Sequence, residues 1–330
     1  MKRDGHTKTD LMPYAAARIR AREKTLLNDK DLDSLLACKS YEDCIQYLLD
    51  RGWGPTQHNE PGELIALERD RLWKLMEELL KGDQQKILDI FRISNDFHNL
   101  KAAIKESYIR KEAAGVYLEN GTIPVNKIRE CAALGEFGTL PAVMAHAAVR
   151  ARDVMFRAGD SQLCDVIIDR ACLESIRKSA LESGNDLLKE YAELQCASAD
   201  INIVIRASKA GKDEEFLKEA LAPCSSLSVQ HLMTASRNGL EQIYEYLEQT
   251  SYRDCVDAIR QSPAAFDKWC DDRMIRMIRP QKYNAFTASP VIAFLLAKEY
   301  EIRSVRLILS GQRNNLDKDK IRERLRESYV

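Results

Sequence analysis

Three observations predict an all-α fold for this chain of 330 residues. Glycine and proline, which turns between strands require, number only 14 and 9. Apolar residues recur at helical spacing, and no segment shows the sustained period-two alternation of a half-buried strand. Similar segments also recur about one hundred residues apart. We therefore expect repeated helical modules.

Turn signals divide the chain into segments of helix length. They stand at residues 52–55, 61–62, 120–121, 159, 184–185, 223 and 280, where glycine, proline or asparagine occurs. Each segment between two signals is expected to form one or more helices, with the signals in the connections.

Near the C-terminus the helical pattern is plain. Apolar residues at i, i+3, i+6 and i+7 form one stripe, made of Ile302, Val305, Ile308 and Leu309. Arg303 and Arg306 stand beside this stripe, where they can reach solvent. The pattern predicts an amphipathic helix that ends at Gly311 and residues 314–315.

A further helix is predicted for the C-terminal tail. Ile321, Leu325 and Tyr329 follow one another at i, i+4 and i+8, with charged residues on the other faces. Asp317 or Asp319 can cap this helix at its N-terminus.

Internal similarities organise the chain. Residues 40–45 recur at 251–256 with an offset of 211, and residues 123–128 align with 227–232 at an offset of 104. Residues 99–105 correspond to 200–206 at an offset of 101. These offsets predict three diverged modules with a period of about 104 residues, at 1–112, 113–218 and 219–330. Chance similarity among helical segments is the alternative.

The net charge of −1 conceals an uneven distribution. Residues 273–330 contain 13 Lys and Arg against 6 Asp and Glu, and residues 1–22 contain 6 against 2. These basic ends are either solvated helix faces or docking faces for unlike partners. Nucleic acid is disfavoured as a partner, because the basic segments lack interleaved aromatics and any reader motif.

Motifs for chemistry are missing from the sequence. It contains no Gly-rich phosphate loop, no His-Glu-x-x-His and no Gly-x-Ser-x-Gly. The nine cysteines never occur as Cys-x-x-Cys and are expected to be reduced small hydrophobes. We therefore expect no catalytic residue, no cofactor, no bound nucleotide and no metal site.

No membrane span or secretory signal is expected either. The longest apolar run, Val291 to Ala297, has seven residues, and the basic N-terminus is not followed by an apolar stretch. A cytosolic location is the prediction.

Several stretches resemble the C subunit of the bacterial and archaeal V-type (A-type) ATP synthases, the counterpart of the d subunit in eukaryotic V-ATPases. Residues 14–27 are similar to the opening helix of that family, and 40–49 to the segment that follows. Residues 96–101 resemble its Asp-x-x-Asn-Leu-Lys element. The strongest similarity runs through 290–311 and continues in 321–330.

The resemblance implies a fold and a role. The family is a pseudo-threefold funnel of helical modules that seats the rotating central shaft, made of D- and F-type subunits, on the membrane ring of c subunits. Such a protein transmits torque for proton or sodium transport, is not catalytic, and sits peripherally on the cytoplasmic face of the membrane. A helical scaffold of another complex is the alternative function, and a helical enzyme with a dispersed site is the third.

Five arginines are the candidate partner interface: Arg18, Arg20, Arg22, Arg303 and Arg306. Arg303 and Arg306, with the basic tail, would serve one docking face, and the three N-terminal arginines another. The competing interpretation is that these arginines form intramolecular pairs between helices.

Overall fold

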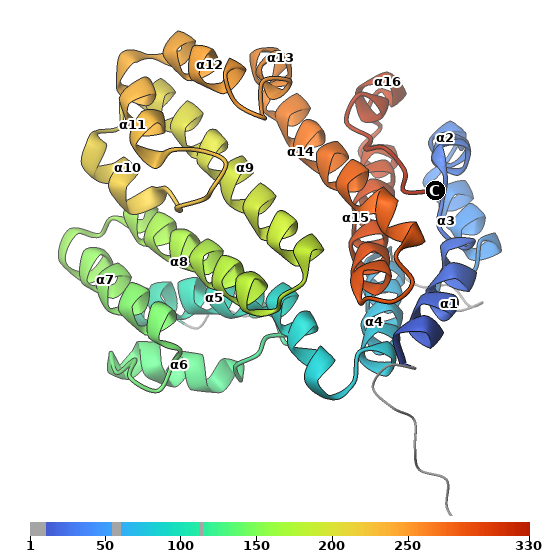
Figure 1. The fold of residues 1–330 in the computed structure, drawn as a ribbon, viewed down its shortest axis with the longest axis horizontal. Coiled ribbons are helices and arrows are strands. Elements are labelled where there is room, and N and C mark those ends of the chain that lie inside the picture. The colour runs from blue at the N-terminus through green and yellow to red at the C-terminus, as the bar shows by residue number, and fades with distance from the viewer. Residues whose placement is uncertain (1–10, 55–60, 112–114) are drawn as a thin grey trace, which may run out of the picture. The chain divides into compact units, whose positions relative to one another are not determined.

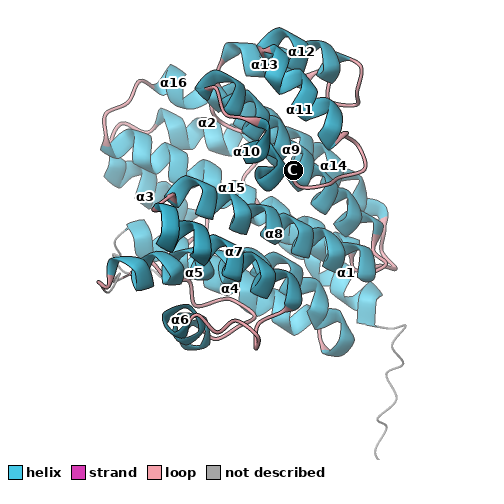
Figure 2. Ribbon diagram, turned by 90° about the vertical axis from the view of Figure 1, so that its left-hand side faces the viewer, coloured by secondary structure: helices cyan, strands magenta, loops and turns pink. Residues whose placement is uncertain are grey.

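The computed structural model describes residues 11–54, 61–111 and 115–330. In this part of the chain the regular elements are all helices, as Figure 2 shows, and no strand occurs. The all-α prediction is confirmed. Contacts divide the chain into two compact units, with unit 1 formed by Met1–Gly82 and Asp257–Val330 and unit 2 by Asp83–Val256. Unit 1 is therefore built from both ends of the chain.

Unit 1 contains four helices from the N-terminal part of the chain and four from the C-terminal part (Figure 1). The first group is α1 (Leu11–Glu23), α2 (Asp29–Ala37), α3 (Tyr41–Asp50) and α4 (Pro61–Leu79). The second group is α14 (Pro263–Ile278), the 3₁₀ helix η2 (Arg279–Tyr283), α15 (Ser289–Arg313) and α16 (Lys318–Arg322). Helix α15 packs against α1, α2, α3, α4 and α14.

The centre of unit 1 is apolar. Leucines of α2 and α3 pack there with the predicted α15 stripe of Ile302, Val305, Ile308 and Leu309, all of them buried. Burial of each large aliphatic side chain contributes roughly 1.5–3 kcal/mol of folding free energy. Because these side chains come from both ends of the chain, their packing holds the two ends together.

Unit 2 is a run of helices, most of them antiparallel neighbours in sequence. They are α5 (Gln85–Ile109), α6 (Val125–Leu134), α7 (Ala142–Ala158), α8 (Ser161–Glu182), α9 (Asp186–Ala210), α10 (Glu214–Ala220), α11 (Val229–Asn238) and α12 (Leu240–Glu248). The short η1 (Gly82–Gln84) and α13 (Cys255–Gln261) stand where the chain passes from one unit to the other. Within unit 2, α8 packs against α5, α7, α9 and α10, and Figure 1 shows it beside α9.

Local sequence explains how many of these helices begin and end. Asn28 and Ser40 form capping boxes with Asp31 and Asp43, each side chain accepting the other residue's backbone N–H. Gly159 ends α7 in the left-handed conformation, with φ 65°, as its turn signal predicted.

The prediction for the end of α15 is correct at Asn314, which caps the helix, and wrong at Gly311. The helix continues to Arg313, and Gly311 lies inside it, buried. A methyl group on Gly311 would stand 2.3 Å from Cδ1 of Ile321, so glycine is required here for close packing of the tail rather than as a stop.

The predicted tail helix is also wrong in extent. Helix α16 covers only Lys318–Arg322, capped by Asp317, and residues 325–330 are not helical. The backbone N–H groups of Glu327 and Ser328 donate to carboxylates of other segments, which replaces helical hydrogen bonding.

The three longest helices each make a similar hydrogen bond to a nearby loop. Helices α5, α9 and α15 each have 25 residues. In each, a buried polar side chain accepts the backbone N–H of a residue that precedes a shorter helix. Asn99 accepts from Leu118 at 2.8 Å, Asp200 from Ala222 at 2.9 Å and Glu301 from Leu27 at 2.5 Å.

Two of these positions, Asn99 and Asp200, are the ones that the internal similarity aligns. The contact therefore supports a repeated design. The three modules, their period and the funnel remain predictions, and the proposed boundary at 112–113 lies outside the described residues.

Candidate partner-docking site

The exposed face of α15 carries three arginines. Arg303, Arg306 and Arg313 are exposed and follow one another at i, i+3 and i+10, which places them on one side of the helix. We call these three residues the α15 basic stripe. The buried apolar stripe of the same helix lies beside these arginines, so the core of unit 1 fixes the direction in which they point.

Two of the three arginines in this stripe carry uncompensated charge. Arg303 pairs with Asp271 of α14 at 3.4 Å and stacks over the Tyr300 ring at 4.8 Å. Arg306 and Arg313 form no ion pair with any residue that the structure describes. Arg313 also borders a polar surface hollow, lined in addition by Lys39, Ser40, Tyr41, Glu42, Gln312 and Asn315.

The predicted arginines of α1 are placed differently. Arg18 pairs with Glu78 at 3.1 Å, and Arg20 pairs with Glu23 at 2.7 Å. Arg22 is exposed and has no ion pair within the described residues. The intramolecular interpretation therefore describes Arg18, Arg20 and Arg303, whereas Arg22 and Arg306 form no ion pair with the described residues.

Arg313 was not among the arginines predicted from the sequence. Its spacing from Arg303 and Arg306 was a usable signal, because positions 303, 306 and 313 share a helix face. Arg313 stands between Gly311 and Asn314, the positions predicted to close the helix.

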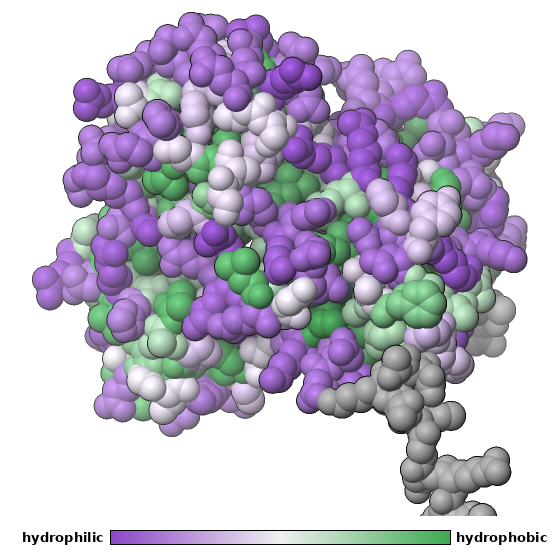
Figure 3. All heavy atoms as spheres, in the orientation of Figure 1, coloured by the Kyte–Doolittle hydropathy of each residue, from purple (hydrophilic) through white to green (hydrophobic). Residues whose placement is uncertain are grey.

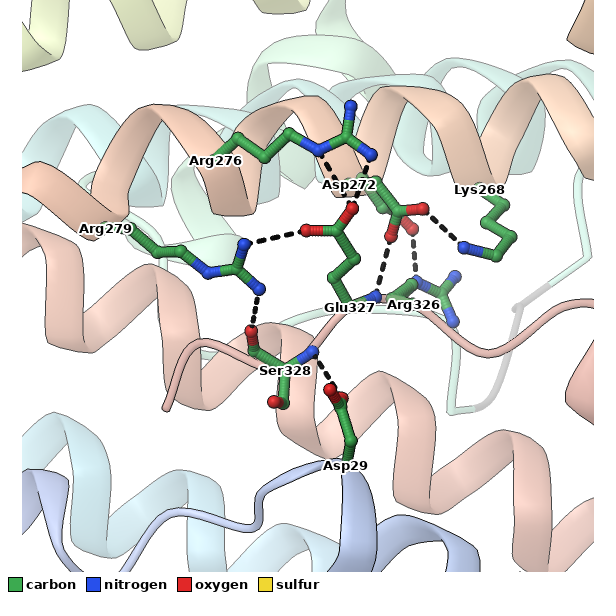
Figure 4. A network of polar contacts seen from close by, with 9 residues as sticks. Asp29, Lys268, Asp272, Arg276, Arg279, Arg326, Glu327 and Ser328 are labelled. Carbon is green, nitrogen blue, oxygen red and sulfur yellow. Dashed lines mark hydrogen bonds and ion pairs between the residues drawn. The ribbon is translucent and has the colours of Figure 1, made fainter.

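The C-terminal tail is held by a network of charged groups around the end of α14 (Figure 4). Glu327 accepts from Arg276 Nε at 2.8 Å and from Arg279 Nη1 at 2.8 Å. Its own backbone N–H donates to Asp272 at 2.7 Å, and the N–H of Ser328 donates to Asp29 at 3.1 Å. We call this network the tail clamp.

Further ionic contacts extend the tail clamp. Asp272 pairs with Lys268, and Arg326 pairs with Asp271, the acid that also holds Arg303. Hydrogen bonding by Arg276 lowers the pKa of Glu327, so its carboxylate is charged at neutral pH. The clamp ties the tail to α14, and through Asp271 it reaches the base of the α15 basic stripe.

The last aromatic residue is buried behind the clamp. The Tyr329 hydroxyl donates to Glu23 of α1 at 3.0 Å, while Lys282 Nζ donates to the Tyr329 carbonyl at 3.0 Å. Lys282 also lies over the Tyr329 ring, 4.4 Å from its centre. Burial raises the pKa of Tyr329 and lowers the pKa of Lys282.

A second polar group stabilises α15 from inside. Lys298 Nζ lies 2.5 Å from Glu301 and 3.2 Å from Glu68 of α4, and stands 4.1 Å from the centre of the Trp53 ring. Glu301 accepts the backbone N–H of Leu27, so it joins α15 to the start of α2. Burial raises the pKa of Glu301, and the charge of Lys298 opposes that shift.

The part of the chain that the structure describes shows how the thiols, the potential metal ligands and the long helices are arranged. No cluster of three His, Cys, Asp or Glu could hold a metal ion there. The nine cysteines are free thiols, six of them buried, and burial raises the pKa of Cys164 to about 11. In that same part, no helix combines the length and the apolar character needed to cross a membrane.

Taken together, the geometry offers a rigid cationic helix face. Arg306 and Arg313 are presented by a helix whose other side is buried and whose neighbour α14 is tied to the tail. An all-helical chain of this kind is typical of proteins that dock in larger assemblies. A family model described as ATP synthase (C/AC39) subunit matches residues 15–324, so the chain belongs to this family of V-type and A-type ATPase subunits.

Curated relatives carry the corresponding names. The C subunit of the A-type ATP synthase of Methanocaldococcus jannaschii is 25% identical, over 96% of this chain and 87% of the relative. The C subunit of the V-type sodium ATPase of Enterococcus hirae is 21% identical, over 80% of this chain and 81% of the relative. The C subunit of the A-type ATP synthase of Pyrococcus furiosus is 23% identical, over 95% and 89%. The resemblance found in the sequence is confirmed.

Proposed function

We propose that this chain is a non-catalytic central-stalk subunit of a rotary V-type or A-type ATPase. It seats the rotating shaft of D- and F-type subunits on the membrane ring of c subunits and transmits torque for ion transport. It is held peripherally on the cytoplasmic face of the membrane through these partners. Membership of the C/AC39 family supports the proposal.

The observation that carries the proposal is the α15 basic stripe. A subunit that transmits torque needs a rigid docking face. Packed helices are rigid because their interiors are close-packed. Arg306 and Arg313 stand on such a helix and have no ion pair with the described residues. Their charges suit an acidic face of a partner protein.

The test is a double charge reversal, Arg306→Glu with Arg313→Glu, in the tagged full-length chain at its native locus. These positions are chosen over Arg303 because Arg303 pairs with Asp271, and its reversal would also damage unit 1. We expect unchanged far-UV circular dichroism, and recovery of c subunits and shaft subunits reduced by about tenfold or more.

The matched control is Lys178→Glu with Arg237→Glu, which makes the same change of charge at exposed positions of α8 and α11. The control should recover both sets of partners. Full recovery with the α15 variant would contradict the docking role of the stripe. Purification of the unaltered chain without any ATPase component would contradict the proposed function itself.

A further inference from the structure

Unit 2 exposes a group of apolar side chains around one arginine. Five large residues of α5, α6 and α7 are between 41% and 63% exposed: Tyr108, Ile109, Leu134, Val149 and Phe156. Figure 3 shows apolar side chains reaching the surface over α6 and α7. Single exposed apolar residues need no explanation, but a contiguous group of them often marks an interaction site.

Contacts show that the group is contiguous. The rings of Tyr108 and Phe156 meet edge to face, with centres 5.4 Å apart. Val149 and Phe156 stand seven residues apart on α7 and share a face with Arg152, which lies between them. The guanidinium of Arg152 lies over the Phe156 ring, 4.4 Å from its centre.

Leu134 is brought beside Arg152 by the end of α6. Gly135 ends that helix with φ 75°, and a methyl group placed on it would lie 2.9 Å from Cζ of Arg152. The backbone at Gly135, directly after Leu134, therefore lies next to the guanidinium of Arg152. We call Tyr108, Leu134, Val149, Arg152 and Phe156 the Arg152 patch.

Arg152 lacks the partner that such a side chain normally has. Its Nε is buried and donates no hydrogen bond in the structure, and its guanidinium pairs with no carboxylate among the described residues. The neighbouring arginines of α7 are paired, Arg150 with Glu219 at 2.5 Å and Arg157 with Asp153 at 2.5 Å. A partly buried cation without a partner is costly, which favours the binding of an incoming anion.

We propose that the Arg152 patch is a second docking site, and that its occupant is a protein segment presenting one carboxylate flanked by apolar side chains. The carboxylate pairs with Arg152, and the apolar side chains cover Val149, Phe156 and Leu134. The Phe156 ring holds the guanidinium in place, so little side-chain freedom is lost on binding.

The charge of unit 2 argues against the other occupants. Residues 83–256 contain 21 Lys and Arg against 26 Asp and Glu, a net charge of −5. An anionic lipid surface or a second copy of unit 2 would be repelled by this net negative charge. A single carboxylate meets Arg152 at contact distance, where the direct pair outweighs distant screened charges.

The experiment places the photo-crosslinking residue p-benzoylphenylalanine at Val149 of the full-length chain in its native cells. After irradiation, cross-linked peptides are identified by mass spectrometry. We expect one segment of another protein, with Asp, Glu or a C-terminal carboxylate beside apolar residues. Arg152→Glu should reduce the cross-linked fraction by about tenfold or more, because it replaces attraction by repulsion.

Two further variants make the test specific. Lys178→Glu makes the same change of charge at an exposed position of α8 and should leave the cross-link unchanged. Reversal of the partner's carboxylate to arginine should restore the cross-link in the Arg152→Glu background. If Arg152→Glu alters far-UV circular dichroism, Arg152→Gln replaces it, with a smaller loss expected.

Other results would overturn the inference. A cross-link to lipid, a cross-link to a second copy of this chain, or no cross-link in an irradiated intact complex would each exclude the proposed occupant. A cross-link that Arg152→Glu does not weaken would exclude the role of the guanidinium. None of these results bears on the α15 basic stripe, which belongs to unit 1.

Discussion

The two units treat their buried carboxylates differently. In unit 1 the buried acids have cations beside them. Glu68 and Glu301 share Lys298, Asp272 pairs with Lys268, and Asp31 pairs with Arg51. The group of Glu68, Lys298 and Glu301 connects α4 with α15. These helices come from opposite ends of the chain.

In unit 2 the buried acids accept hydrogen bonds from N–H and O–H groups of nearby loops and have no ion pair within the described residues. Asp96 accepts from the Thr122 hydroxyl at 2.6 Å and from the Ile123 backbone N–H at 3.1 Å. Asp200 accepts from Ala222 with one oxygen, while its Oδ2 is buried without a hydrogen-bond partner. Burial raises the pKa of Asp200 to about 7.

The difference shows what each kind of contact does. Ion pairs in unit 1 make each buried charge depend on its partner, and the pair between Lys298 and Glu68 also joins distant segments. Hydrogen bonds in unit 2 fix the loop that leads into the next helix, and the acid there is tolerated because it can bind a proton. Removing the partner should therefore harm unit 1, whereas removing the charge should help unit 2.

The largest effect is expected for Lys298→Ala in unit 1. The substitution leaves Glu301 buried without its cation, and the loss of stability should be about 3–5 kcal/mol. Urea unfolding of the full chain measures the loss, and hydrogen exchange assigns it to unit 1. The exposed Lys24→Ala is the control and should change stability by less than about 0.5 kcal/mol.

A rescue variant sharpens this prediction. Glu68→Gln, Lys298→Met and Glu301→Gln together remove every charge of the group, and most of the lost stability should return. A loss below about 1 kcal/mol for Lys298→Ala would mean that water reaches Glu301 and that the pair does not fasten α15.

An effect of opposite sign is expected for Asp200→Asn in unit 2. The carboxyl has a pKa of about 7 in the folded chain and an ordinary value of 3.8, so the folded state binds the extra proton between these values. The contribution of Asp200 to the free energy of unfolding is therefore fully present below about pH 4 and is lost as the pH rises through 7. Asparagine has no charge to bury, so the variant should be more stable by about 2 kcal/mol at pH 8.

Asn99 shows that asparagine fits this kind of position, because the internal similarity aligns it with Asp200. Its amide accepts from Leu118 N–H and donates to Leu118 C=O. The measurement is the difference in unfolding free energy between wild type and variant at several pH values. Asp169→Asn, at a half-exposed ion pair, is the control. A difference that is the same at pH 5 and pH 8 would show that Asp200 does not titrate in this range.

The smallest effect is expected at the tail clamp. Glu327→Gln weakens the contacts with Arg276 and Arg279, which are partly exposed, and should cost about 1 kcal/mol at pH 7. The pKa of Glu327 is lowered in the folded state, so its contribution is present above the ordinary value of 4.5 and is lost as the pH falls through the folded value.

Unfolding of wild type and Glu327→Gln at pH 7 and about pH 3 tests the clamp, since the difference should be smaller in acid. Glu323→Gln, an exposed neighbour without a side-chain contact among the described residues, is the control. An equal cost at both pH values would assign the effect to packing of the tail instead of charge.

Much of the fold was predictable because helices carry their signals locally. The spacing of Ile302, Val305 and Ile308 predicted which side of α15 is buried. Of the two caps that the sequence offered for α16, Asp317 and Asp319, the structure has Asp317. The helix predicted beyond residue 324 was wrong, because its helical spacing is overruled by Asp29 and Asp272, which lie far away in sequence. Carboxylates that accept backbone N–H groups from residues 55 or 299 positions away leave no periodic signal in the sequence.

The candidate site was predictable only in part. Composition located the basic C-terminal segment, and helical spacing placed Arg303 and Arg306 on an exposed face. The sequence could not say that Arg303 is paired with Asp271 while Arg306 has no ion pair with the described residues, because pairing depends on which helices become neighbours. The Arg152 patch was hidden for the same reason, since α5, α6 and α7 each supply part of it.

The sequence by itself determined the all-helical class, the buried side of α15 and the family, because these follow from periodicity, turn signals and the order of local motifs. The tertiary structure decided which charges are paired and which remain available. Coulombic and hydrogen-bond energies depend on distances of a few ångströms between segments, and those distances exist only once the helices have packed.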